Sequence, residues 1–151
     1  ISTAEDWGTN GQDTEYGYGR LDGYAAVESA GGFNGTNIDV PDHMYGSEDL
    51  TARRNSDIWE FTVNSTSDPI AITLIMPDWS NSRNPDFDVY LYDASGTKVA
   101  SSTGTGRQEN INYTPTSTGT YKIEVYSYYR TGDYYFDLSA DGSGLTLTQD
   151  Q

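Results

Sequence analysis

The sequence predicts a mainly β protein, an antiparallel β-sandwich or jelly roll preceded by one short α-helix. From Asp57 onward, apolar and polar residues alternate in five segments, and turn residues separate these segments. The composition agrees, because 13 Tyr and 16 Gly accompany many Thr and Ser, and almost no run of strong helix formers follows Ala30. An all-helical fold is excluded.

The predicted helix lies in the first part of the chain. Leu21, Ala25 and Ala26 fall at helical spacing, and Gly31 and Gly32 supply a C-terminal stop. A helix this short is unstable alone in water, so it must pack on another part of a protein. Residues 1–31 are therefore predicted to be a separate terminal segment, and residues 32–56 a polar connector.

The predicted strands each present one apolar face, and together they make a domain over residues 57–141. The core-facing sets are Trp59, Phe61 and Val63; Ile70, Ile72, Leu74 and Met76; Phe87, Val89 and Leu91; Tyr121, Ile123 and Val125; Tyr134, Phe136 and Leu138. Two weaker strand candidates cover residues 99–102 and 109–113. Residues 142–151 are rich in Gly, Thr and Gln and are predicted to be a flexible tail.

The charge balance narrows the range of partners. With 23 acidic and 8 basic residues, the formal charge is -15 and the pI about 4.1. This field repels phosphate backbones and anionic lipid, so we expect neither nucleic acid nor a membrane as a partner. The chain has no cysteine, which excludes disulfides and thiolate metal sites.

Two parts of the chain resemble known families. The opening TAEDWGTNGQDTEYGYGRLDGYAAVESA resembles the last segment of a subtilisin-like serine protease domain (peptidase S8 family), in which a YGxG turn leads into a helix packed on the catalytic domain. The blocks SDIWEFTV, DFDVYLYDASGTKVASS and GTYKIEVYSYYRTGDYYFDLS resemble, in order, the prepeptidase C-terminal domain, a β-sandwich appended to secreted proteases. The resemblances imply a secreted, extracellular protein whose partner is the catalytic domain of the same precursor.

The motifs for catalysis are absent. A Ser-His-Asp site needs a nucleophile, a base and an orienting acid. The subtilisin-like family carries these in D-[ST]-G, H-G-T-H and G-T-S-M-A segments, none of which occurs here, and the sole histidine is His43 in VPDHMYG. The chain is therefore not expected to be an enzyme on its own, but part of a serine endopeptidase that hydrolyses peptide bonds.

A calcium site is predicted in the loop MPDWSNSRNPDFDVYLYD. Calcium takes six to eight oxygen ligands, and this loop folds back onto an Asp-x-Asp strand start. The candidate ligands are Asp78, Asn81, Asn84, Asp86 and Asp88. The spacing is not that of an EF-hand. The alternative is that these residues serve as a turn, a cap and a solvated strand residue, with Arg83 compensating the charge.

A second acidic cluster spans the connector and the first strong strand. It comprises Asp39, Asp42, Glu48, Asp49 and Asp57. The resemblance to sandwiches of secreted collagenases implies calcium at Asp57 and at Asp39 and Asp42. Arg53 and Arg54 lie nearby in sequence, and a salt-bridged surface without metal is the account that we favour for this cluster.

Tyrosines occupy the strand faces opposite the core. They are Tyr90, Tyr92, Tyr126 and Tyr128, with Tyr129 and Tyr135 close by. Packing against a sheet edge or an adjoining domain is the favoured role, and binding of a polymer is the alternative.

These observations predict the non-catalytic C-terminal portion of a secreted subtilisin-like serine endopeptidase. Its β-jelly roll would stabilise the enzyme by binding Ca²⁺. Two alternatives stay open. The chain could be a module that binds polymeric protein substrate, or an independent extracellular adhesion or surface-layer domain.

Overall fold

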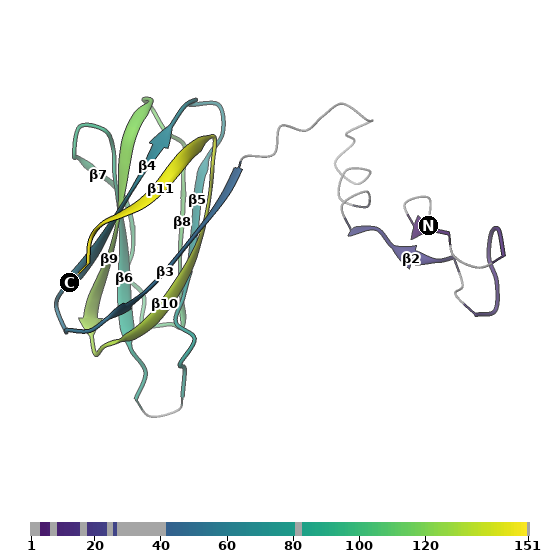
Figure 1. Ribbon diagram of the computed structural model, residues 1–151, viewed down its shortest axis with the longest axis horizontal. Helices are drawn as coiled ribbons and strands as arrows, with labels where there is room; N and C mark the ends of the chain where they lie inside the picture. Colours follow the sequence, from purple (N-terminus) through teal and green to yellow (C-terminus); the bar gives the residue numbers. More distant parts are fainter. Residues whose placement is uncertain are drawn as a thin grey trace. The chain divides into compact units, whose positions relative to one another are not determined.

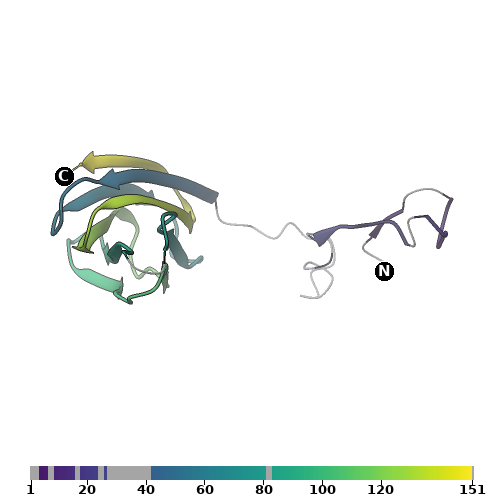
Figure 2. The same cartoon turned by 90° about the horizontal axis from the view of Figure 1, so that it is seen from below.

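The computed structural model describes residues 4–6, 9–15, 18–23, 26, 42–80 and 83–150. The chain divides into two compact units, Ile1–Val40 and Pro41–Gln151. The second unit consists of two antiparallel sheets packed face to face, as Figure 1 and Figure 2 show. The predicted mainly β, antiparallel sandwich is confirmed. In the part of the chain with described coordinates, no helix is both long enough and apolar enough to cross a membrane.

The first unit contains one short strand pair. β1 (Ala4–Glu5) pairs antiparallel with β2 (Arg20–Leu21), and the side chains of Arg20 and Glu5 form an ion pair. Gly19 has φ 93°, and a Cβ there would lie 2.1 Å from the carbonyl oxygen of Glu5, so only glycine fits this close approach. Strand pairing therefore occurs at a position where no strand was predicted.

The predicted helix is found in part. Ala26 donates a backbone hydrogen bond to the Asp22 carbonyl at 3.0 Å, and Gly23 and Ala26 are helical. Leu21, which was expected on the helix, lies in β2 instead, because its backbone pairs with Ala4. Residues 27–40, which include the expected Gly31 stop and Asp39, lie outside the described residues.

The described residues of the second unit form nine strands in two sheets. The four-stranded sheet has the order β3 (Asp42–Leu50), β10 (Gly132–Ala140), β5 (Ile70–Ile75) and β8 (Gln108–Tyr113). The five-stranded sheet has the order β11 (Gly142–Gln149), β4 (Ser56–Val63), β9 (Gly119–Tyr129), β6 (Asp86–Tyr92) and β7 (Lys98–Ser102). All seven predicted strands are present, including the two weaker ones, which are β7 and β8.

Two edge strands lie where no strand was expected. β3 occupies residues that were predicted to be a polar connector, and β11 occupies the predicted tail. Both are edge strands, and in β3 only Gly46 and Leu50 are buried. A strand that buries so few side chains shows no alternation of apolar and polar residues in its sequence. Backbone hydrogen bonds hold these two strands in place, β3 against β10 and β11 against β4.

The core between the sheets contains aromatic side chains and a series of hydrogen bonds between three buried residues. Trp59 meets Phe136 edge-on at 5.3 Å, and Phe87 meets Tyr134 at 6.3 Å. Trp59 Nε1 donates to Tyr134 Oη at 2.8 Å, and Tyr134 Oη donates to Asp57 Oδ2 at 2.8 Å. Every core-facing residue predicted from the period of two is buried. These contacts join β4 and β6 of one sheet to β10 of the other.

Gly46 provides a test of this packing. It pairs with Phe136, and a Cβ at position 46 would lie 2.3 Å from Phe136 Cε1 and 2.4 Å from Cζ. Because the ring is held in the core, Gly46→Ala should destabilise the domain by about 1–3 kcal/mol. Urea unfolding measures this difference.

Gly106→Ala is the matched control. Its Cβ would meet only backbone atoms of Gln108, at 3.8 Å and beyond. The change should alter stability by less than about 0.5 kcal/mol. Equal stability of the two variants would contradict the packing described for Gly46.

Candidate functional site

A polar bowl lies on the outer face of the five-stranded sheet. Because Phe87, Val89 and Leu91 point into the core, the alternate residues of β6 face outward. The bowl has a volume of about 530 Å³, and its lining residues are Asp86, Asp88, Tyr90, Thr103, Thr105, Tyr126 and Tyr128. Two carboxylates therefore share one concave surface with threonine hydroxyls and tyrosine rings.

The two carboxylates are poorly solvated. Asp88 is only 6% exposed and accepts a hydrogen bond from Tyr90 Oη at 2.9 Å. Oδ1 of Asp86 is buried and has no hydrogen-bond partner within the described part of the chain. These atoms carry negative charge that water does not fully stabilise.

Burial and like charge act together on the pKa values. Burial raises the pKa of Asp86, and the charges of Asp88 and Glu109 raise it further. Burial also raises the pKa of Asp88; the Tyr90 hydrogen bond opposes this shift and the charge of Glu109 adds to it. Each shift indicates a carboxylate that lacks a compensating positive charge.

Glu109 is a third acid, which the sequence analysis did not single out. It lies on β8 of the other sheet, is 2% exposed, and its Oε2 accepts hydrogen bonds from Ser102 Oγ and from Gly104 N at 3.1 Å. Its Oε1 is buried without a partner among the described residues. The sequence does indicate the burial of Glu109. This residue lies two positions before the core residue Ile111, so both side chains are on the same face of the strand.

The other predicted ligands of this loop are placed differently. Asp78 is exposed and does not line the bowl. Asn84 Oδ1 accepts a hydrogen bond from Ser80 N at 2.6 Å, which closes the loop before β6. Asn81 lies outside the described residues. Within the described ranges, no three acidic, histidine or cysteine side chains are grouped closely enough to hold a metal ion.

The second acidic cluster is not one surface site. Asp57 lies on the same face of β4 as Trp59 and Phe61, which is the face that points into the core. It is therefore fully buried, and it accepts the hydrogen bond from Tyr134. Asp42 is exposed at the start of β3. Neither Arg53 nor Arg54 forms an ion pair with any described residue, so the expected salt bridges are not found there.

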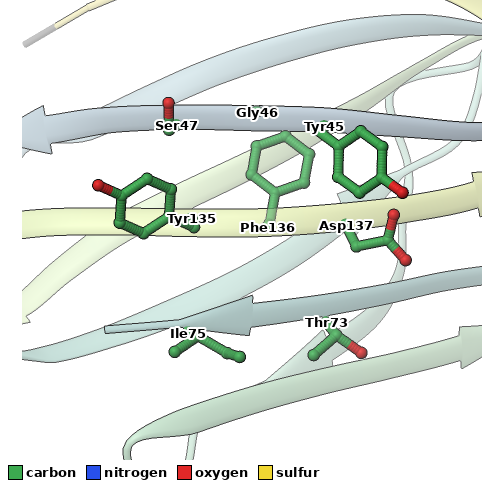
Figure 3. Close-up of a pocket in the computed structure, with 8 residues that line it drawn as sticks. All are labelled: Tyr45, Gly46, Ser47, Thr73, Ile75, Tyr135, Phe136 and Asp137. Atoms are coloured by element: carbon green, nitrogen blue, oxygen red, sulfur yellow. The ribbon is translucent and has the colours of Figure 1, made fainter. Parts of the chain in front are cut away.

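The four-stranded sheet carries a different surface feature, an apolar groove of about 270 Å³. Figure 3 shows its lining, with Tyr45 on β3, Tyr135 on β10, and Ile75 and Thr73 on β5. Tyr45 is 75% exposed and Tyr135 is 54% exposed. Tyr135 was predicted to lie on an outer strand face, whereas Tyr45 was not, because it lies on β3, where a polar connector was predicted.

The tyrosines of the five-stranded sheet differ in exposure. Tyr92 Oη donates to Glu124 Oε2 at 2.6 Å, which fixes that ring on the sheet. Tyr128 and Tyr129 are 59% and 42% exposed. Only some of these rings therefore have a packing partner within the sheet face itself.

The carboxyl pKa values can be measured directly by NMR titration of carboxyl carbons in buffer with a chelator. Asp86 and Asp88 should titrate above the ordinary value of 3.8, whereas Asp93 should titrate below it, because Ser95 and the Thr97 backbone donate to its carboxylate. A raised pKa in the folded state means that the ionised groups destabilise the metal-free fold. That destabilisation is present above the folded pKa and is lost as pH falls through it. Midpoints for Asp86 and Asp88 at or below that of Asp93 would contradict the burial described here.

Comparison with known proteins agrees with the architecture. Residues 55–127 match the family model of the bacterial pre-peptidase C-terminal domain. The fold is similar to a 1.0 Å crystal structure of the pre-peptidase C-terminal domain of collagenase from Bacillus anthracis, with 20% sequence identity and a TM-score of 0.51. That likeness covers 66% of this chain and 90% of the collagenase domain. A pre-peptidase C-terminal domain is therefore present in this chain.

Proposed function

We propose that this chain is the non-catalytic C-terminal portion of a secreted subtilisin-like serine endopeptidase, and that its sandwich stabilises the enzyme by binding calcium. The pre-peptidase C-terminal domain, which is a C-terminal module of secreted proteases, supports an accessory role and an extracellular location. The resemblance of residues 1–31 to the end of a subtilisin-like domain supports the identity of the partner. The absence of the triad motifs from the sequence supports a role without catalysis.

The observation that carries the calcium proposal is the pair of poorly solvated carboxylates on β6. Asp86 and Asp88 repel one another, and an oxygen of Asp86 is buried without a described partner. A hard divalent cation prefers such oxygens. Asp78, Asn81 and Asn84 remain proposed contributors from the same loop, with carbonyl oxygens and water completing the shell. Asp39, Asp42 and Asp57 are not part of this proposal. Asp57 is buried beside Tyr134, which pairs with Glu48, whereas Asp42 pairs with Ala140 six residues away along β3.

Bound calcium would stabilise the domain by mass action. Calcium that binds the folded form and not the unfolded form adds about 2.7 kcal/mol at a hundredfold excess over the dissociation constant. This corresponds to a rise in Tm of roughly 2–8 °C per kcal/mol for domains of this size range. Thermal unfolding in calcium and in excess EGTA measures the difference, and Asp86→Asn with Asp88→Asn should abolish it.

A variant with the same change in net charge is the control. Glu15 and Asp150 are exposed and far along the chain from β6, so Glu15→Gln with Asp150→Asn should keep the full calcium response. An unchanged Tm of the wild-type chain on adding calcium would contradict the proposal. A response that survives in the Asp86 and Asp88 variant would place the calcium elsewhere.

The groove of the four-stranded sheet favours a second candidate function, binding of polymeric protein substrate. Tyr45 and Tyr135 present large ring surfaces to solvent across a groove that is mostly apolar. Exposed aromatic rings give contact area at low entropic cost and are enriched in binding surfaces. His43 and Asp137, whose Nδ1 and Oδ2 atoms are 3.0 Å apart, add polar groups on the same two strands.

Sedimentation with insoluble collagen and keratin tests this second function. Tyr45→Ala with Tyr135→Ala should lower the bound fraction several-fold, because two central aromatic contacts are lost. Tyr128→Ala removes an equally exposed ring from the other sheet and should leave binding unchanged. Absence of saturable binding by the wild-type chain would exclude the substrate-binding function.

The upstream coding sequence separates both functions from an independent adhesion or surface-layer domain. A subtilisin-like catalytic domain directly before residue 1 is the expected finding. An adhesin-like repeat in that position would contradict the protease assignment.

A further inference from the structure

Three of the eight basic residues of this acidic chain gather at one end of the sandwich. Arg53 and Arg54 lie in the turn between β3 and β4, and Arg130 follows directly after β9. Backbone hydrogen bonds join these segments, because Arg54 N donates to Ser127 O at 2.8 Å and Ser127 N donates to Asn55 O at 2.9 Å. We call Arg53, Arg54, Arg130 and Tyr129 the arginine cluster.

Two guanidinium groups of the cluster lie against one tyrosine ring. The Cζ atom of Arg53 is 4.9 Å from the Tyr129 ring centroid, and that of Arg130 is 5.1 Å from it. Arg53 Nε also donates to Tyr128 O at 3.4 Å, and Arg130 Nη2 donates to Tyr129 Oη at 3.5 Å. The ring attracts each cation, but two positive charges on one ring repel each other. An anion between or beside them would remove that repulsion.

The backbone of the cluster is also unusual. Arg54 has φ 66° and Arg130 has φ 67°, and they are the only non-glycine residues with positive φ in the described ranges. Glycine or asparagine adopts this conformation more easily than arginine does. The Ser127 hydroxyl donates to the Arg130 carbonyl and holds this turn. Strained backbone concentrates at functional sites, so its presence at two arginines directs attention to their guanidinium groups.

The cluster has spare donors, and no acid among the described residues pairs with them. None of its arginines forms an ion pair with a described residue, and Arg130 Nε is buried without a hydrogen-bond partner in the described part of the chain. Arginine presents its donors as a planar fork that fits a carboxylate with two parallel hydrogen bonds. The free fork positions and the missing acid together indicate an anion supplied from outside the sandwich.

We propose that the arginine cluster is a docking site for a single carboxylate side chain of another polypeptide. Charge complementarity selects this occupant, because the cluster is a local positive patch on a chain of formal charge -15. The surrounding negative field disfavours doubly charged phosphate and polyanions more than a single carboxylate. The cluster contains none of the proposed calcium ligands and neither tyrosine of the groove, and its nearest link to the bowl is the pairing of Tyr129 with Asp86.

NMR titration of the full chain tests the proposal. The probe is the blocked peptide Ac-Gly-Glu-Gly-NH2, with the corresponding Gln peptide as the uncharged comparison, and the readout is the set of arginine Nε resonances at about 0.1 M salt. The Glu peptide should shift the resonances of Arg53 and Arg130 saturably, and the Gln peptide should not. Arg53→Gln should weaken binding about tenfold.

Two further variants keep the test decisive. Arg83→Gln removes the same charge from an exposed arginine outside the cluster and should leave the affinity unchanged. Arg130→Lys keeps the charge but loses the planar fork, so it should weaken binding, and a thermal unfolding measurement checks that this variant folds. Equal weakening by Arg83→Gln, no saturable shift, or tighter binding of inorganic phosphate than of the Glu peptide would each overturn the proposal.

Discussion

The buried chain of hydrogen bonds from Trp59 through Tyr134 to Asp57 constrains how the two sheets meet. Trp59 and Asp57 lie on β4 and Tyr134 lies on β10, so the chain crosses the core from one sheet to the other. A buried indole N–H, a phenol and a carboxylate are tolerated only when each finds its partner, which a shift of one residue along either strand would prevent. Burial and the hydrogen bond to Asp57 also raise the pKa of Tyr134, so the phenol stays protonated and remains a donor.

This register decides what each strand presents to solvent. With Phe87, Val89 and Leu91 in the core, β6 must turn Asp86, Asp88 and Tyr90 outward into the bowl. With Tyr134 and Phe136 in the core, β10 must turn Tyr135 outward into the groove of the other sheet. The polar bowl and the aromatic groove thus lie on different sheets, and each can be altered without disturbing the other.

The period of two predicted the central strands correctly, because they bury one side chain in every two. It failed at β3 and β11, where edge strands are held by backbone pairing and most side chains are exposed. The adjacent acids Asp86 and Asp88 could be predicted as a pair from the Asp-x-Asp spacing. Glu109 comes from a strand 21 residues further along the chain than Asp88, so only the pairing of strands brings its charge near. Asp57 was expected in a surface cluster, although its position two residues before Trp59, on the same strand face, already indicated burial.

We propose that the carboxylates of β6 bind a divalent cation. Anomalous diffraction from crystals of this chain grown with calcium tests it most directly. The account predicts a calcium peak about 2.3–2.6 Å from carboxylate oxygens of both Asp86 and Asp88. A well-ordered β6 with no peak beside these residues, or calcium bound only near Asp57, would contradict it.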